Sequence, residues 1–408
     1  MFEKIIEKSN ILVSATDLSF VRNIYDEIDW SQKLIGIVGQ RGIGKTTLLL
    51  QYLKINNLKK GVYFSADNIN IIKYGLYEVI NNLYFKEGKR EFFIDEIHKY
   101  QNWNQELKNI YDDFVDIKIV FSGSSSIDII KGKYDLSRRL TLYRMTGFSF
   151  REYLNKTKKL NLKSYSLEEI LKNHENLSKE IHNQIGNEII SDFGMYLKSG
   201  YYPFSFESDI LETFYNKLLG TIDKLIYEDI SNFYKLDSLN LEKLRKIIIF
   251  FAFSTPGELS INSLKEKLGL AYDTVVNYLD ILQEVGLIRG LSTFGVISKT
   301  IRKSKKIYID NTNIIYAIQN ETGFNLEIGT LREIFFLNQL SNKYKVFFSD
   351  IGGDFLINIG ENKYIFEVGG KNKTKKQIKN LSNSFVVSDD IIFGSQNKIP
   401  LYLFGFIY

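Results

Sequence analysis

Residues 33–54, KLIGIVGQRGIGKTTLLLQYLK, decide the fold of this chain. They consist of a short apolar stretch, a glycine-rich turn and an amphipathic stretch, and the turn fits G-x-x-x-x-G-K-[ST] at every position from Gly39 to Thr46. Glycines let the backbone curl, so that successive N–H groups point at a phosphate at the start of a helix. The pattern therefore predicts a strand, a phosphate-binding loop and a helix.

The residues of this loop have separate expected roles. Lys45 is expected to reach the β- and γ-phosphates of ATP, and the hydroxyl of Thr46 to ligate Mg²⁺. We predict that ATP and Mg²⁺ are the cofactors. The residues expected to bind the nucleotide are Gly39, Gln40, Arg41, Gly42, Ile43, Gly44, Lys45, Thr46 and Thr47.

A second motif follows at residues 91–96, EFFIDE, where an apolar strand ends in two acids. Asp95 is expected to hold Mg²⁺, directly or through water, and Glu96 to polarise the attacking water. A kinase of this fold would not need the second acid. The pair therefore favours hydrolysis.

Two further groups are candidates for contact with the γ-phosphate. The next strand, residues 117–123, runs into a serine-rich loop, where we favour Ser124 over its neighbours as the sensing hydroxyl. Arg138 and Arg139 follow, and a guanidinium there would neutralise charge in the transition state. Two adjacent arginines cannot point the same way, and the sequence leaves open which one acts and whether the two are instead a solvated or structural pair. It also leaves open whether that arginine acts within the chain or across the interface of a homo-oligomer.

Together these stretches resemble the prokaryotic AAA-superfamily ATPases of the archaeal type. The resemblance covers nearly the whole chain and implies a C-terminal domain of unknown function similar to PD-(D/E)XK nucleases. His98 and Trp103 fall within that family's DEI-x-K…W stretch, and from the residues alone we interpret Trp103 as a packing residue and His98 as a surface residue. The stretches that carry the resemblance are GQRGIGKTTLLLQYL (39–53), FFIDEIHKYQNW (92–103), VFSGSSS (120–126) and RRLTLYRMTGFSFREYL (138–154).

The length of 408 residues is enough for several domains. We predict the α/β class, with a P-loop NTPase parallel sheet, a helical lid, a winged helix-turn-helix and a C-terminal α/β nuclease-like domain. The expected boundaries are 1–150 for the ATPase core, 151–235 for the lid or connector, 236–300 for the winged helix and 301–408 for the nuclease-like domain. Strands of the core are expected at residues 33–39, 62–67, 91–97, 116–124 and 140–146.

The winged-helix prediction leaves DNA binding open. The predicted helix at residues 271–285 carries Asp273, Asp280 and Glu284 but no lysine or arginine, and Asn277 is its best candidate for reading a base. This acidity favours a structural or protein-docking role as much as DNA reading. The cations that are candidates for phosphate contact are Lys299, Arg302, Lys303, Lys305, Lys306, Lys371, Lys373, Lys375, Lys376 and Lys379.

A nuclease site would need acids and a lysine around a divalent metal. Glu333, Asp354 and Glu367 match the acidic positions that the resemblance implies, but the expected lysine two residues after the last acid is Gly369. Lys371 could substitute one rung further along the strand, because alternate residues share a face. The two glycines before it loosen that geometry. We therefore expect a degenerate nuclease site rather than an intact one.

Composition excludes several classes of protein. Cysteine is absent and there are 3 histidines, so a disulfide framework, a thiolate nucleophile, cysteine-ligated zinc and a histidine-rich metal cage are excluded. The net charge of +5 is too weak over this length to indicate a polyanionic partner by itself. The first residues carry acids and form no signal sequence, and the longest apolar run, residues 247–253, is far shorter than the ~20 residues that span a bilayer. These features favour a soluble, cytoplasmic protein without a membrane partner.

The sequence predicts Mg²⁺-dependent binding and hydrolysis of ATP, coupled to the C-terminal modules. Two alternatives stay open. One is a non-catalytic nucleotide switch that signals through a protein partner, and the other is an ATP-controlled nuclease that acts on DNA.

Overall fold

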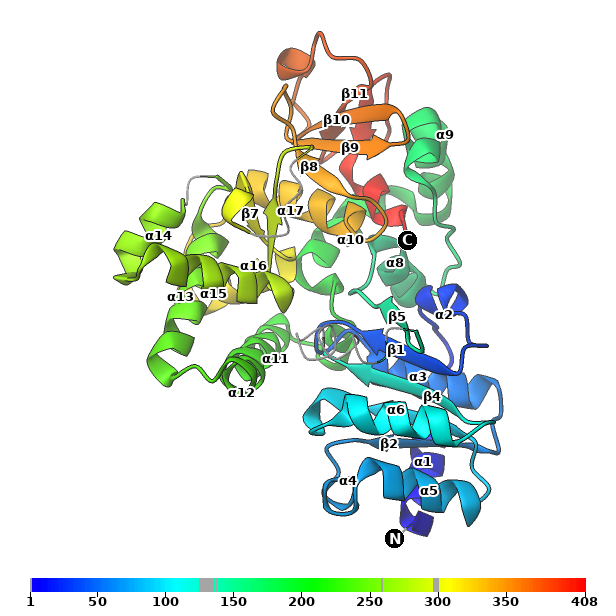
Figure 1. The fold of residues 1–408 in the computed structure, drawn as a ribbon. Coiled ribbons are helices and arrows are strands. Elements are labelled where there is room, and N and C mark those ends of the chain that lie inside the picture. The colour runs from blue at the N-terminus through cyan, green and yellow to red at the C-terminus, as the bar shows by residue number, and fades with distance from the viewer. Residues whose placement is uncertain (1, 125–135, 137, 258–259, 296–300) are drawn as a thin grey trace. The chain divides into compact units, whose positions relative to one another are not determined.

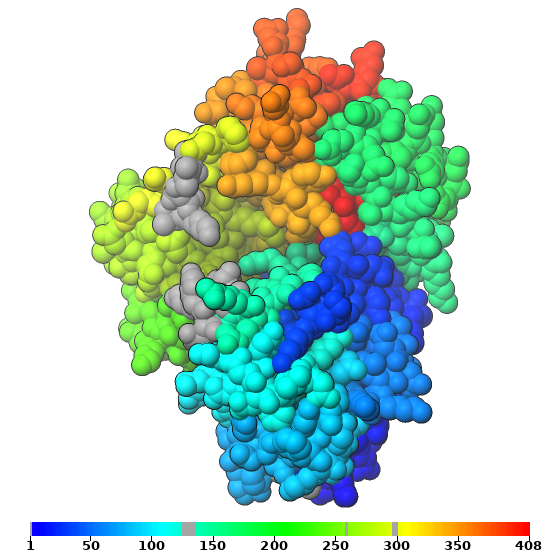
Figure 2. Space-filling model, turned by 45° about the vertical axis from the view of Figure 1, so that its right-hand side comes forward, coloured from blue at the N-terminus to red at the C-terminus, as the bar shows by residue number. Residues whose placement is uncertain are grey.

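The computed structural model describes residues 2–124, 136, 138–257, 260–295 and 301–408. The chain forms two compact units, Met1–Gly147 and Phe148–Tyr408. They are the blue-to-cyan and green-to-red parts of the chain in Figures 1 and 2. Among the described residues, no helix combines the length and the apolarity needed to cross a membrane.

The first unit contains a five-stranded sheet whose neighbouring strands are all parallel, in the order β2-β3-β4-β1-β5. Every residue of β1 is buried, as expected for a parallel strand covered on both faces. The predicted parallel sheet is confirmed. Its strands are β1 (Leu34–Val38), β2 (Gly61–Ser65), β3 (Glu91–Asp95), β4 (Lys118–Gly123) and β5 (Thr141–Arg144).

Helices pack around this sheet (Figure 1). Trp103 begins one of them and is a packing residue, as predicted, because its ring is buried with its centroid 5.6 Å from that of Phe121. The first helix was not predicted, and the hydroxyl of its Ser9 accepts a 2.9 Å hydrogen bond from the backbone N–H of Tyr63 on the edge strand β2. The helices are α1 (Phe2–Ala15), α2 (Ile24–Glu27), α3 (Lys45–Ile55), α4 (Ile69–Tyr74), α5 (Leu76–Phe85) and α6 (Trp103–Asp113).

The second unit starts with helices and ends with a mixed sheet of order β12-β11-β10-β9-β8. Serine capping boxes start its first two helices at Ser149 and Ser166, because each serine and the glutamate three residues later satisfy one another's backbone N–H groups. The helices are α8 (Phe150–Lys158), α9 (Leu167–Ile185), α10 (Ile189–Met195), α11 (Leu211–Lys224), α12 (Ser231–Tyr234), α13 (Ser238–Phe253), α14 (Ile261–Leu268), α15 (Tyr272–Glu284), α16 (Thr312–Thr322) and α17 (Ile328–Leu340). The strands are β6 (Ile288–Leu291), β7 (Lys306–Ile309), β8 (Val346–Phe348), β9 (Phe355–Ile359), β10 (Asn362–Gly369), β11 (Ser384–Ser388) and β12 (Lys398–Pro400).

The two ends of this second unit are joined by hydrogen bonds. The Ser149 hydroxyl and Arg151 Nε donate to the backbone oxygen of Tyr408 at 2.8 and 2.9 Å. The 3-10 segment Leu401–Phe406 just before Tyr408 is buried. The start of α8 therefore packs against the end of the chain.

Buried Asn313 on α16 satisfies the backbone where a π-helical segment, Tyr196–Gly200, interrupts the usual hydrogen-bond ladder. Its side-chain oxygen accepts from the N–H of Tyr201 at 2.9 Å. Its Nδ2 donates to the carbonyl oxygens of Tyr196 and Leu197 at 3.2 and 2.9 Å. One amide thus satisfies three backbone groups that water does not reach.

We predict that Asn313→Leu lowers the free energy of unfolding by about 2–4 kcal/mol, because three buried backbone groups lose their hydrogen bonds to the Asn313 amide. Denaturant unfolding of the second unit measures the change. Asn320→Leu on the exposed face of the same helix is the matched control and should change it by less than about 0.5 kcal/mol. Equal effects of the two substitutions would contradict the assignment.

Candidate active site

The predicted loop, acids and serines meet at one edge of the parallel sheet. Val38 at the end of β1 pairs with Gly123 at the end of β4, and Ile94 of β3 pairs with Phe121 of β4. Strands β1, β4 and β3 are neighbours, so the segments that follow them emerge side by side. Ligands of open parallel sheets bind at this edge, outside the carboxyl ends of the strands.

The glycine-rich loop, residues 39–44, leads into α3, whose first turn is Lys45–Thr47. Gly44 has a φ of 94°, a left-handed conformation that glycine adopts without strain. A Cβ at Gly39 would lie 2.2 Å from the carbonyl oxygen of Met145 and 2.4 Å from Cδ1 of Ile43. The loop therefore requires glycine at these positions for backbone reasons.

Lys45 is buried and its ammonium group folds over this loop. Its Nζ donates to the carbonyl oxygens of Gly39 and Gln40 at 2.9 and 2.8 Å. Phosphate oxygens are stronger acceptors for an ammonium group than neutral carbonyls, because they are charged. The geometry thus suits a lysine that exchanges these carbonyls for phosphate.

Asp95 is buried and accepts hydrogen bonds from three hydroxyl groups. Thr46 Oγ1 and Tyr63 OH donate to its Oδ2 at 2.6 and 2.9 Å, and the Ser122 hydroxyl donates to its Oδ1. Burial, followed by the charge of Asp95, raises the pKa of Tyr63 far above its usual range, so this tyrosine stays a donor. Thr46 and Asp95 together supply the hydroxyl and carboxylate oxygens that suit Mg²⁺.

Tyr63 and Ser122 were not identified as partners of Asp95 in the sequence analysis. One signal was available. Both are hydroxyl-bearing residues within otherwise apolar buried strands, and a buried hydroxyl needs a partner.

Glu96 adopts a left-handed backbone conformation, with φ 53° and ψ 40°. This conformation costs energy for a residue with a side chain and is found where the surrounding structure enforces it. The Glu96 side chain is 27% exposed and its Oε2 lies 3.4 Å from Nε2 of His98. The second acid thus stays accessible to solvent, while Asp95 is buried.

The interpretation of His98 as a surface residue is wrong, because its side chain is only 4% exposed. The 3-10 turn Ile97–Lys99 that follows Glu96 brings the ring under the end of β4. There the backbone N–H of Ser124 donates to Nδ1 of His98 at 3.4 Å. His98 therefore lies between the catalytic candidate Glu96 and the end of β4.

The other predicted residues of the active site are placed as follows. Ser124 is buried, and its neighbours Ser125 and Ser126 lie outside the described residues. Arg139 makes a bidentate contact with Asp112, with Nε–Oδ1 and Nη2–Oδ2 distances of 2.9 Å each. Arg138 is exposed.

Arg22 is a buried residue that the sequence analysis did not single out. Its guanidinium donates to the carbonyl oxygen of Ile43 in the phosphate-binding loop at 2.9 Å. It also donates to the carbonyl oxygens of Thr146 and Gly147, where the chain leaves the first unit, at 2.9 and 3.0 Å. One side chain thus connects the loop to this exit.

In the second unit, Glu333 and Asp354 both contact Lys306, and Glu367 contacts Lys373. Lys371, the predicted substitute lysine, is exposed, and Lys373 is the residue that reaches Glu367. The expected phosphate-binding cations are also partly engaged, since Arg302 pairs with Asp273 and Lys299 lies outside the described residues.

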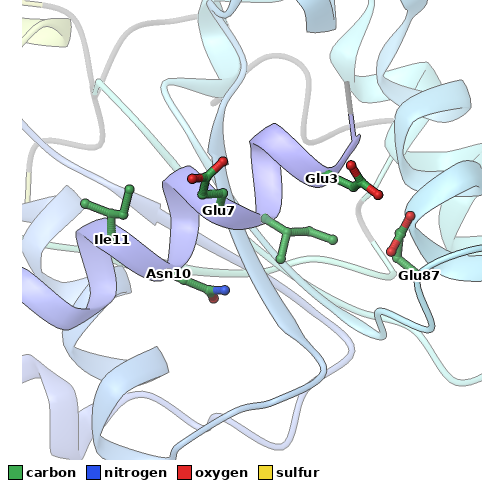
Figure 3. A pocket seen from close by; sticks show the side chains of 6 residues that line it. Glu3, Glu7, Asn10, Ile11 and Glu87 are labelled. Carbon is green, nitrogen blue, oxygen red and sulfur yellow. The ribbon is translucent and has the colours of Figure 1, made fainter.

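A hollow of about 400 Å³ lies beside α1, on another part of the first unit (Figure 3). Glu87 belongs to the connection that precedes β3, so this hollow is at the amino end of the strands, opposite the phosphate-binding loop. We assign it no part in the site. The residues that line it are Glu3, Ile6, Glu7, Asn10, Ile11 and Glu87.

Comparison with known proteins places the chain in a family. The uncharacterised protein MJ1637 of Methanocaldococcus jannaschii is 31% identical over 392 residues, which cover 90% of this chain and 82% of that protein. The chain belongs to the MJ1637 family. A second uncharacterised protein of the same organism, MJ1544, is 26% identical over 359 residues, which cover 85% of this chain and 76% of that protein.

Two domain families match parts of this MJ1637-family chain. Residues 31–154 match the family described as an AAA domain, so the predicted AAA-type P-loop ATPase domain is confirmed. Residues 190–325 match a domain of unknown function, DUF8612, which extends across the expected boundaries at residues 235 and 300.

Two solved structures with a bound nucleotide show weak similarity. DnaA from Aquifex aeolicus bound to AMPPCP is 16% identical, with a TM-score of 0.27 over 69% of this chain and 88% of that chain. The Hsp104–ADP complex of S. cerevisiae is 16% identical, with a TM-score of 0.28 over 70% of this chain and 39% of that chain. Similarities of this size carry no argument about function.

We predict that Tyr63→Phe lowers the stability of the first unit by about 1.5–3 kcal/mol, because a buried carboxylate loses a hydrogen bond. It should also weaken binding of Mg²⁺-ATP several-fold, because Asp95 is held less firmly. Thermal unfolding and isothermal titration calorimetry measure the two effects. Tyr74→Phe, at an exposed tyrosine, is the control, and a Tyr63 variant that matches it in both measurements would contradict the role.

Proposed function

We propose that this member of the MJ1637 family binds ATP with Mg²⁺, hydrolyses it, and passes the nucleotide state to residues 148–408. The observation that carries the proposal is the 2.6 Å contact between the Thr46 hydroxyl and the Asp95 carboxylate, at the residue that follows Lys45. A hydroxyl, a carboxylate and an ammonium group so arranged at the start of a helix suit a nucleoside triphosphate and its metal ion.

Each group has a role in this proposal. Bound Mg²⁺ would neutralise charge on the β- and γ-phosphates. The backbone N–H groups of residues 39–46 orient the phosphates, and Lys45 binds their outer oxygens. Glu96 orients a water molecule for attack on the γ-phosphorus and accepts its proton. His98 positions the Glu96 carboxylate and is itself held by the backbone N–H of Ser124.

The contacts of Arg22 support a route by which a change at the nucleotide site is transmitted to Thr146 and Gly147. A shift of the phosphate-binding loop on nucleotide binding would move the Ile43 carbonyl. Arg22 would carry that movement to Thr146 and Gly147, since the same guanidinium binds all three carbonyls. Packed polar networks of this kind tend to move as a unit.

The competing function is a switch that binds the nucleotide without turnover. The accessible Glu96 carboxylate beside buried Asp95 favours hydrolysis. A nucleic-acid partner is not needed for this function. Several cations expected to contact phosphate are engaged with carboxylates, as Arg302 with Asp273 and Lys306 with Glu333 illustrate. The winged helix and the nuclease-like domain remain predictions for residues 236–300 and 301–408.

We predict that Lys45→Ala weakens ATP binding by roughly 10- to 100-fold, because charged hydrogen bonds to phosphate are lost. Glu96→Gln should leave binding intact and slow hydrolysis by on the order of 10²–10⁴, because the general base is removed. Binding of labelled ATP and single-turnover phosphate release separate the two effects.

Lys59→Ala, at an exposed lysine beyond the end of α3, is the control for Lys45. The non-catalytic switch would be favoured by two results together. Wild-type turnover would be slow and unchanged by Glu96→Gln, and ATP binding would still be lost in Lys45→Ala.

We predict different outcomes for the two adjacent arginines. Arg139→Ala should lower stability by at most about 1 kcal/mol, because its pair with Asp112 is partly exposed. Arg138→Ala should leave stability unchanged and lower turnover by on the order of 10³, if its guanidinium stabilises the transition state. Turnover measured on a mixture of the Arg138→Ala and Glu96→Gln variants tests the homo-oligomer: partial recovery means that Arg138 acts across an interface. Full turnover of Arg138→Ala would remove it from the site.

A further inference from the structure

Three carboxylates converge in the second unit. Glu333 comes from α17, Asp354 from the residue before β9, and Glu367 from β10. Their side chains are 17%, 18% and 1% exposed. Burying three acids together is unfavourable, because each loses hydration and each repels the others.

Lys306 compensates two of these acids. It begins β7, and its Nζ lies 3.3 Å from Oε2 of Glu333 and 3.5 Å from Oδ1 of Asp354. The Tyr308 hydroxyl on the same strand donates to Oε2 of Glu333 at 2.7 Å. The ammonium group thus bridges two carboxylates, as a metal ion between them would.

Lysine 373 compensates the third acid. Its Nζ lies 2.5 Å from Oε1 of Glu367. Its stem crosses Gly369, where an added Cβ would lie 2.7 to 2.9 Å from the side-chain carbons of Lys373. The absence of a side chain at position 369 therefore makes the room through which Lys373 reaches the acid.

The two ammonium groups offset two of the three carboxylate charges of this cluster. Burial and then the Asp354 charge raise the pKa of Glu333, while Lys306 and Tyr308 oppose the change. Burial also raises the pKa of Glu367 against the effect of Lys373. Burial alone would lower the pKa of Lys373. Its contact with Glu367 and the charges of the three acids outweigh burial, so the pKa of Lys373 is raised and this lysine stays an ammonium ion.

Two observations bear on a metal ion at this place. Oε2 of Glu367 is buried and has no hydrogen-bond partner among the described residues, which leaves one acceptor of this carboxylate unsatisfied. However, in the described part of the chain no group of three or more histidine and acidic residues could hold a metal ion as the side chains now lie. With Lys306 and Lys373 in contact with the acids, the residues present therefore do not fit the divalent metal that a nuclease site would need.

We propose that Lys306 and Lys373 stand in for a divalent cation in a three-carboxylate site, so that the site is closed to metal ions by the chain's own ammonium groups. Two monovalent cations supply the two positive charges of such an ion, one bridging Glu333 and Asp354 and the other on Glu367. This role concerns residues 306–373 alone and is independent of ATP hydrolysis.

The test is Mn²⁺ binding to the nucleotide-free full-length protein, followed by electron paramagnetic resonance and by thermal unfolding. The variant Lys306→Met/Lys373→Met keeps most of both apolar stems and removes both ammonium groups. Asp354→Asn is added to this variant and, separately, to the wild type. The Mn²⁺ binding that is lost on this addition is the binding that depends on the carboxylate cluster, and it does not include any Mn²⁺ held at Thr46 and Asp95.

We expect no Asp354-dependent Mn²⁺ binding in the wild type and one such site in the double variant. Mn²⁺ in large excess should raise the melting temperature of the double variant by roughly 5 °C, since a bound ion stabilises the folded state. Asp354-dependent binding in the wild type would overturn the proposal. The proposal would also be overturned if the double variant folds but shows no Asp354-dependent Mn²⁺ binding.

A second measurement decides the matter if the double variant does not fold. Lys373→Met alone should lower the melting temperature, because the buried Glu367 carboxylate loses its partner, and addition of Glu367→Gln should restore most of the loss. A Lys373→Met variant as stable as the wild type would show that the ammonium group compensates nothing.

Discussion

The buried carboxylate of Asp95 is the constraint on which the first unit depends. A buried carboxylate is tolerated only when donors surround it, and here the donors come from α3, β2 and β4. These hydroxyls can meet at one point only if β4 lies beside β3 and the phosphate-binding loop follows the strand beyond it, as in the observed order β2-β3-β4-β1-β5. The geometry of the candidate metal ligands Thr46 and Asp95 therefore depends on the strand order of the sheet. Because Asp95 is already surrounded by donors, Glu96 is the acid that remains accessible to water.

Much of this arrangement can be predicted from the sequence, because the loop pattern and the apolar runs are local. The loop, the five strands and the acids at 95 and 96 follow from residue types at fixed spacing. The contact between Ser122 and Asp95 is harder to predict, because it depends on the register in which β3 pairs with β4. The burial of His98 depends on the left-handed turn at Glu96, which no residue pattern indicates. Arg22 precedes the loop by about twenty residues and acts through carbonyl groups, which leave no signal in the sequence.

The second unit shows why counting charges is a poor guide to a binding surface. The sequence indicates a series of cations at 302–306 and 371–379, but Arg302, Lys306 and Lys373 each contact a carboxylate that is distant in the sequence. Gly369 illustrates the same difficulty. In the sequence it is a missing lysine, whereas in the structure it makes room for a lysine four residues later. The helices α13 to α15 and most strands were predictable from periodicity, while the three-residue strand β12 is too short to produce a pattern.

The hydrogen bonds from Ser149 and Arg151 to the backbone oxygen of Tyr408 have a consequence for synthesis on the ribosome. All contacts of the sheet in residues 1–147 form within the first third of the chain, so this unit can fold while translation continues. The second unit cannot complete its packing until residue 408 has left the exit tunnel. At about 5–20 residues per second this interval lasts on the order of tens of seconds, during which α8 exposes apolar surface. Until Tyr408 has emerged, residues 148–400 should therefore depend on chaperones more than residues 1–147 do.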